Sequence, residues 1–93
     1  MILDFRCTET EKIFLGQVSA IFPPDIQRVA RRKLVYLDAA TRLEDLRVPP
    51  GNRLEALRGG RSGQHSIRIN DQWRICFVFA DDGVHQVEIV DYH

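Results

Sequence analysis

The chain has 93 residues, of which 44% are hydrophobic and 28% charged, and its formal net charge at pH 7 is zero. This length predicts one domain over residues 1–93 with a modest core, and it argues against a deep, lidded cleft for a large cofactor. No apolar run has the length of a membrane-spanning helix, and residues 1–10 lack the basic and apolar regions of a signal peptide. We therefore expect a cytoplasmic protein.

The neutral net charge hides an uneven distribution. Residues 27–74 contain eleven of the thirteen basic residues, whereas residues 75–93 contain four acidic residues and no Lys or Arg. Eleven of the thirteen cations are Arg, whose planar guanidinium suits phosphate oxygens. The pattern is typical of an RNA-binding surface, and it is equally compatible with a solvated basic face.

The two cysteines, Cys7 and Cys76, have neither metal-ligand spacing nor a CxxC pattern. We expect two free thiols, no metal site and no cofactor. The sequence also lacks the glycine-rich phosphate loops, the HExxH helix and the GxSxG turn that mark several common enzyme classes.

The first half of the chain predicts one strand and several helices. Residues 2–6 alternate loosely and predict a strand, and Thr8 with Glu11 forms a capping-box pattern for a helix over residues 8–15. A second helix follows Pro23 and Pro24, with apolar residues at helical spacing: Ile26, Val29, Ala30, Leu34 and Leu37. Residues 41–46 predict one more helical turn, and residues 48–52 predict a loop.

The second half predicts an antiparallel meander. Strands are expected over residues 53–57, 64–69 and 72–79, followed by a last strand that runs to the terminus. Residues 59–63, 70–71 and 81–83 predict the turns between them. The fold class is therefore α+β, with an N-terminal strand and helices packed on one face of a twisted, mainly antiparallel sheet. On the strand over residues 72–79, Trp73, Ile75, Phe77 and Phe79 should face the helices. Arg74 and Cys76 should lie on an open face that can bind a ligand.

Five arginines come from neighbouring strands and turns of this predicted sheet: Arg53, Arg58, Arg61, Arg68 and Arg74. Such a cluster repels itself unless an anion binds, so a phosphate backbone is its natural ligand. The alternative is internal pairing with the acidic residues Glu55, Asp71, Glu88 and Asp91.

The last three residues, Asp91, Tyr92 and His93, place acid–base and donor groups together. RNA cleavage by the substrate's 2′-hydroxyl needs a base, cations for the charged phosphorane and an acid for the leaving oxygen. His93 can titrate near neutral pH. The alternative is a frayed polar terminus. Elsewhere, His65 is interpreted as a packed strand residue, His85 as a surface residue and Cys76 as a small packing residue.

Three segments together resemble a known family. They are the glycine turn of residues 53–67, the hairpin strand of residues 70–77 with its NDQWRI motif, and residues 87–93, which end in DYH. In combination, and over the whole chain, they are similar to HigB-type toxins of the RelE/ParE superfamily of type II toxin–antitoxin systems.

The resemblance implies a metal-independent endoribonuclease that cuts messenger RNA on the ribosome. It implies active residues at Asp91, Tyr92, His93 and Arg74, with Arg58 as a further basic residue. Where the best-known member has His, this chain has Glu55, so the general base is either Glu55 or His93. The implied partners are the ribosome, messenger RNA and a HigA-like helix-turn-helix antitoxin, with operator DNA bound only through the antitoxin complex.

Two other functions remain open at this stage. A ParE-like toxin would share the fold and poison DNA gyrase without cutting RNA, and a degenerate member would bind its antitoxin only to tune transcription. Asp91, Tyr92, His93 and Arg74 favour the nuclease, because a binding protein has no need of an acid–base cluster. Glu55 is the one residue that favours the degenerate member.

Overall fold

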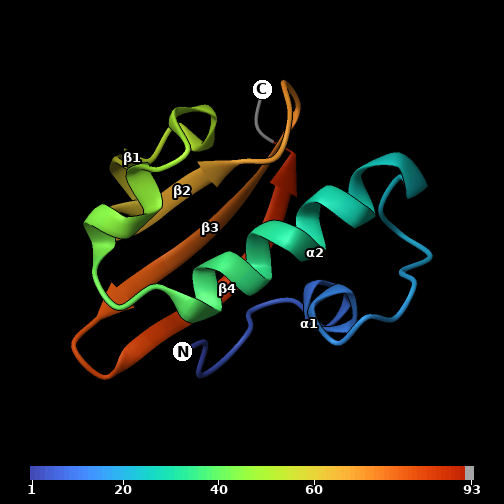
Figure 1. Ribbon diagram of the computed structural model, residues 1–93, viewed down its shortest axis with the longest axis horizontal. Helices are drawn as coiled ribbons and strands as arrows, with labels where there is room; N and C mark the ends of the chain where they lie inside the picture. The colour runs from blue at the N-terminus through green and yellow to red at the C-terminus, as the bar shows by residue number, and fades with distance from the viewer. Residues whose placement is uncertain (92–93) are drawn as a thin grey trace.

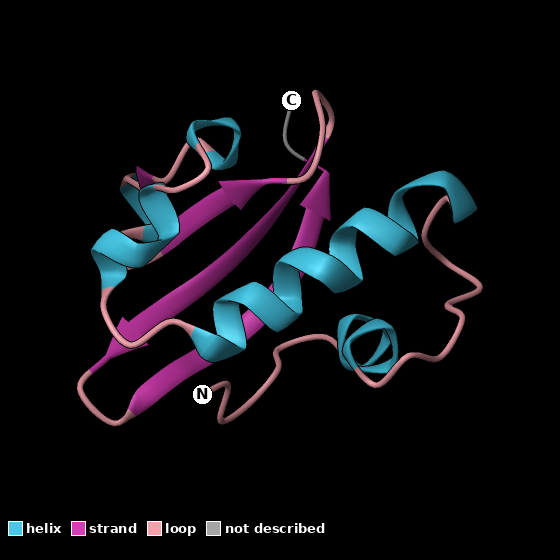
Figure 2. Ribbon diagram, viewed as in Figure 1, coloured by secondary structure: helices cyan, strands magenta, loops and turns pink. Residues whose placement is uncertain are grey.

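A layer of helices covers one face of a four-stranded antiparallel sheet in the computed structural model, which describes residues 1–91 (Figures 1 and 2). The helices are α1 (Thr8–Phe14) and α2 (Pro24–Ala39), and three short 3-10 helices follow: η1 (Leu43–Arg47), η2 (Pro50–Asn52) and η3 (Gly59–Arg61). The strands are β1 (Glu55–Ala56), β2 (His65–Arg68), β3 (Trp73–Ala80) and β4 (Gly83–Asp91), and they pair in that order. The predicted α+β class and the meander are confirmed.

Helix α2 forms where the apolar spacing predicts it. Pro24 occupies the first helical turn, where its missing N–H costs nothing, and Asp25 adds a favourable charge there. The residues at helical spacing that face the sheet are buried: Ile26, Ala30, Leu34 and Leu37. Arg28, Arg31 and Arg32 are exposed on the opposite, solvent side of the helix, whereas Lys33 is half-buried and donates to the buried Asn52 side chain. In the part of the chain that the structure describes, no helix is long and apolar enough to cross a membrane.

The predicted capping box of the first helix is wrong. Helix α1 begins at Thr8 itself, so Cys7 takes the N-cap position, and no side chain caps it. The Glu11 N–H donates to the Cys7 carbonyl as an ordinary helical hydrogen bond. The segment after α1 is held instead by Glu9, whose carboxylate accepts from the Ser19 hydroxyl at 2.8 Å and pairs with Lys12 at 2.8 Å.

The predicted N-terminal strand is also wrong as a regular strand. Residues 2–6 lie along the outer edge of β4 but form only two isolated parallel bridges, Ile2 with Val84 and Phe5 with Val87. Between these bridges β4 is irregular, because its register with β3 shifts and Gln86 has a φ of 54°. The irregularity interrupts the edge to which a continuous strand would have paired. The strand predicted over residues 53–57 is likewise reduced to Glu55 and Ala56.

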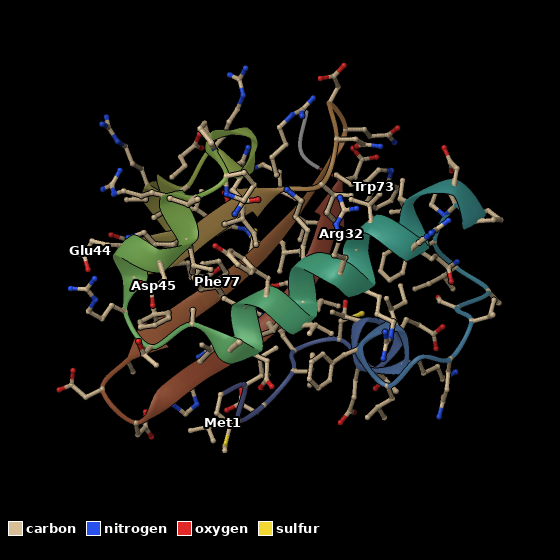
Figure 3. All side chains as sticks on the ribbon, viewed as in Figure 1. Met1, Arg32, Glu44, Asp45, Trp73 and Phe77 are labelled. Carbon is tan, nitrogen blue, oxygen red and sulfur yellow. The ribbon has the colours of Figure 1, made fainter. Side chains whose placement is uncertain are left out.

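The core lies between α2 and the helix side of the sheet, as the alternation predicts. Ile75 and Phe77 on β3 are fully buried against Leu34 and Leu37 of α2, within one cluster of buried apolar side chains. Trp73 packs edge-on against Phe22, with ring centroids 5.6 Å apart. Trp73 and Phe77, which are labelled in Figure 3, thus mark the face of β3 that the helices cover.

The opposite face of the sheet is not open where the sequence predicted it to be. Cys76 is fully buried and Arg74 is only 7% exposed. Residues from two places in the segment before β2 contact this face: the Arg53 carbonyl accepts from Arg74, and Arg61 reaches Glu88 on β4. The two-residue alternation along a strand assigns side chains to the two faces of the sheet, but it does not reveal which face another segment covers.

Candidate active site

A row of polar side chains crosses the sheet on the face away from α2. Strand register places Glu55 opposite Ser66, Ser66 opposite Cys76, and Cys76 opposite Glu88. Directly opposite residues share a face in an antiparallel sheet, so one residue from each of the four strands lines this row. The next residue on this face of β3 is Arg74, which lies opposite Arg68 and Val90.

Arg74 donates hydrogen bonds to two residues of neighbouring segments, Ser66 and Arg53. Its Nε donates to the Ser66 hydroxyl at 2.7 Å, and one terminal nitrogen donates to the carbonyl oxygens of Arg53 at 2.6 Å and Ser66 at 3.3 Å. These contacts fix a guanidinium, a permanent cation, at the floor of the candidate site.

Two exposed arginines lie in the segment between η2 and η3. Arg53 follows η2 and has a left-handed backbone, with φ 46° and ψ 56°. Arg58 immediately precedes η3, and it lines a cavity of about 350 Å³ together with Glu55, Ala56 and Leu57. Within residues 1–91, no salt bridge joins Arg53 or Arg58 to an acidic side chain. Both arginines can therefore meet an external anion.

The other two predicted phosphate-binding arginines are paired internally, as the alternative interpretation held. Arg61 lies 3.2 Å from the Glu88 carboxylate and also donates to Gln64. Arg68 pairs with the fully exposed carboxylate of Asp71. A phosphate would have to compete with Glu88 for Arg61, whereas the Arg68 pair at the surface is weak and easily exchanged.

The predicted terminal cluster is described only in part. Asp91 is exposed, and its carboxylate accepts from the Gln72 side-chain amide at 3.0 Å. Register pairs Asp91 with Trp73 and Val90 with Arg74, so Asp91 and Arg74 occupy positions on opposite faces at the end of the sheet. Tyr92 and His93 lie outside the described residues.

The comparison with known proteins decides the family. Residues 4–93 match the family described as RelE-like toxin of type II toxin-antitoxin system HigB. The chain belongs to the HigB-like toxins. It is 45% identical to Toxin HigB-1 of Vibrio cholerae serotype O1, over 100% of this chain and 98% of that protein. It is 31% identical to Endoribonuclease HigB of Proteus vulgaris, over 100% of both chains. An uncharacterized protein of Haemophilus influenzae is 32% identical over 77% of this chain and 71% of its own length.

The predicted resemblance is thus confirmed, and membership in a toxin–antitoxin system implies an antitoxin partner. The sequence predicted no metal site, and this stays a prediction. In the part of the chain that the structure describes, no three His, Cys, Asp or Glu side chains gather closely enough to hold a metal ion.

Two other side chains considered in the sequence, His65 and Cys76, are partly and fully buried in the toxin, respectively. His65 stacks on Phe77, with ring centroids 6.4 Å apart, and its buried Nδ1 has no hydrogen-bond partner. Burial raises the pKa of the Cys76 thiol, which makes it a poor nucleophile. Both fit the packing roles predicted from the sequence.

Two features of the toxin were missed from the sequence. His85, interpreted as a surface residue, lies between two carboxylates, with Nδ1 2.6 Å from Asp4 and Nε2 2.7 Å from Asp82. Ser66 was not singled out, although the alternation of residues 64–69 places it on the face of Arg68 and Arg74. A small hydroxyl residue opposite a strand arginine is the signal that could have found it.

Proposed function

We propose that this toxin is a metal-independent endoribonuclease that cuts messenger RNA on the ribosome and arrests growth in the cytoplasm. The observation that carries the proposal is the oriented guanidinium of Arg74, which bonds to Ser66 and to the carbonyl of the exposed Arg53. The name of the full-length relative from Proteus vulgaris, Endoribonuclease HigB, supports the reaction class.

In the proposed reaction, the 2′-hydroxyl of one nucleotide attacks the adjacent phosphorus. A base removes the hydroxyl proton, the O2′–P bond forms, the P–O5′ bond breaks, and an acid returns a proton to the 5′-oxygen. The phosphorane carries extra negative charge, and Arg74 with Arg58 stabilises it. Arg53, Arg61 and Arg68 bind the flanking phosphates, as the cationic surface of an RNA-binding protein does.

The acid–base groups of the proposed reaction come from Glu55, Asp91, Tyr92 and His93. Glu55 is exposed on β1 and lines the same cavity as Arg58, which supports it as a base. His93 is the other candidate base. Comparing Glu55→Gln with His93→Gln separates them, because removal of the base should slow cleavage about a hundredfold or more, and removal of the other residue much less.

The proposed dependence on the ribosome follows from the exposure of the site. Arg53, Glu55 and Arg58 are all exposed, so these described residues form no wall that would hold a flexible RNA with its 2′-hydroxyl in line with the scissile bond. Such alignment is worth several orders of magnitude in rate, and the ribosome supplies it by holding the messenger. Equally fast cleavage of naked RNA and of ribosome-bound messenger would contradict this part of the proposal.

The decisive experiment is to induce the toxin in cells and map the 5′ ends of messenger RNA. Cuts inside translated codons support the nuclease. DNA breaks that depend on gyrase, without new RNA ends, would support a ParE-like toxin instead. Growth without either effect would support a degenerate toxin.

The proposed partner is a HigA-like antitoxin with a helix-turn-helix domain. Co-expression with such a protein should abolish growth arrest and give a stable complex that binds operator DNA, whereas the toxin alone should not bind it. Operator binding by the purified toxin alone would contradict this assignment.

A further inference from the structure

Ser66 makes a short side-chain contact to Arg74. Its hydroxyl lies 2.7 Å from Arg74 Nε, and its side chain is completely buried. Register sets Ser66 at the centre of the polar row, between Glu55 on β1 and Cys76 on β3. A buried hydroxyl at this position can reach no water, so the arginine is its partner.

We propose that Ser66 is a positioning residue, which acts together with the Arg53 carbonyl to hold the Arg74 guanidinium in one orientation for phosphate binding. The inference rests on the proposed function, in which Arg74 contacts the scissile phosphate. Ser66 itself touches no substrate and acts only through Arg74.

The geometry constrains both the plane and the tilt of the guanidinium. The group presents its N–H donors in a fixed planar fork. The Ser66 hydroxyl accepts from Nε at one edge, and the Arg53 carbonyl accepts from a terminal nitrogen at 2.6 Å. The two acceptors belong to different elements, β2 and the segment after η2. Together they restrain rotation of the guanidinium plane.

The chemistry of these acceptors separates Arg74 from its neighbours. Arg61 and Arg68 donate to carboxylates, which orient a guanidinium and also offset its charge. The Ser66 hydroxyl and the Arg53 carbonyl, by contrast, are neutral acceptors. Orientation of the donor before the substrate arrives is what stabilisation of a phosphorane requires.

The left-handed backbone of Arg53 belongs to the same arrangement. A non-glycine residue is disfavoured at φ 46°, and the contact with Arg74 is one of the interactions that hold it there. The hydrogen bond from Arg74 thus also connects the backbone of the exposed Arg53 to the sheet, and Ser66 positions the Arg74 side chain that makes this bond.

The first test needs no variant and no substrate. The Nε–H protons of Arg74 and of the exposed Arg58 are compared by hydrogen exchange in nuclear magnetic resonance spectra of the purified toxin. The proposal expects much slower exchange at Arg74 in the native toxin and a large acceleration in Ser66→Ala. Equal exchange at Arg74 and Arg58 in the native toxin would overturn it.

The second test is a double-mutant cycle on ribosome-bound messenger RNA, with Ser66→Ala, Arg74→Ala and the double variant, and with Ser62→Ala as an exposed serine control. Ser66→Ala should lower kcat about 10- to 100-fold with little change in KM, because the donor is misplaced rather than removed. In the Arg74→Ala background the same change should have no further effect. Thermal unfolding and antitoxin binding monitor the fold of each variant.

The outcomes distinguish the two proposals. If Arg74→Ala keeps full activity, the proposed role of Arg74 in cleavage fails. If Arg74→Ala is inactive while folded Ser66→Ala is as active as Ser62→Ala, the positioning role alone fails. An equal loss from Ser66→Ala in both backgrounds would also overturn it, because Ser66 would then act independently of Arg74.

Discussion

At the residue scale, the sheet face away from α2 is held together by side-chain contacts rather than by apolar packing. Arg74 bonds to Ser66 and to the Arg53 carbonyl, and Arg61 bonds to Glu88 above the buried Cys76. A buried polar group that loses its partner costs more than the contact itself contributes. Substitutions here should therefore affect stability as well as activity.

Arg74→Ala should lower the free energy of unfolding by about 1–3 kcal/mol, because it leaves the Ser66 hydroxyl buried without its donor. Its unfolding by urea is compared with that of Arg68→Ala, whose partner Asp71 is fully exposed. Arg68→Ala should change the free energy by about 0.5 kcal/mol or less. An Arg74→Ala protein as stable as Arg68→Ala would contradict the buried arrangement.

His85 predicts a pH dependence of stability. Hydrogen bonds to Asp82 and Asp4 raise the pKa of His85 above its ordinary value of 6.5, and His85 lowers the pKa of Asp4. A raised folded pKa means that the protonated imidazole stabilises the folded state fully below pH 6.5, and that this contribution is lost as the pH rises through the folded pKa. The free energy of unfolding should therefore fall as the pH rises above 6.5 and through the raised pKa of His85.

The control for this prediction is His85→Gln, which has no titrating ring. Urea denaturation across the same pH range should show a clearly flatter profile for His85→Gln than for the native toxin. Parallel profiles would show that the pH dependence arises from groups other than His85.

At the element scale, the N-terminal segment depends on a glycine of β4. Gly83 has a φ of 145°, and a Cβ built there would lie 2.8 Å from the Met1 carbonyl and 2.9 Å from the Leu3 side chain. The Leu3 N–H donates to the Val84 carbonyl, and the Val84 N–H donates to the Met1 carbonyl. Residues 1–3 can therefore dock on β4 only because residue 83 has no side chain.

Gly83→Ala should lower the free energy of unfolding by about 1–3 kcal/mol, from backbone strain and from displacement of the N-terminal segment. Gly60→Ala is the matched control, because no atom lies within 4 Å of the corresponding Cβ. Thermal unfolding measures both variants, and hydrogen exchange of the Leu3 and Val84 amides reports undocking directly. If Gly83→Ala and Gly60→Ala unfold at the same temperature with the Leu3 amide still protected, the segment docks without help from Gly83.

At the scale of the whole molecule, the apolar core and the candidate active-site residues lie on different faces of the sheet. The apolar cluster lies between the helices and one face of the sheet, whereas Arg53, Glu55, Arg58 and Arg74 lie on or beside the other face. Asp91 is exposed at the end of β4, beyond Ile89 of the cluster, so its substitution should spare the core.

Deleting Tyr92 and His93 should give a folded toxin that still binds its antitoxin but neither arrests growth nor cuts messenger RNA, because the last residues of most domains contribute little to packing. Circular dichroism and antitoxin pull-down check the fold, and 5′-end mapping checks cleavage. Full toxicity of the shortened chain would place the active residues elsewhere on the molecule. Loss of the fold would show that the terminus stabilises the core.

The sequence by itself determined the α+β class, the burial of α2, the antiparallel meander with its inward aromatic residues, and the resemblance to HigB-type toxins. These follow from local periodicity, turn residues and short motifs, which the chain carries independently of its distant contacts. Only the tertiary structure decided that Arg74 is buried, that Ser66 and Arg53 hold it, that Glu88 pairs with Arg61, and that residues 2–6 form bridges rather than a strand. Each of these depends on which distant segment folds back over a given face of the sheet, and the spacing of residues within a strand carries no information about that.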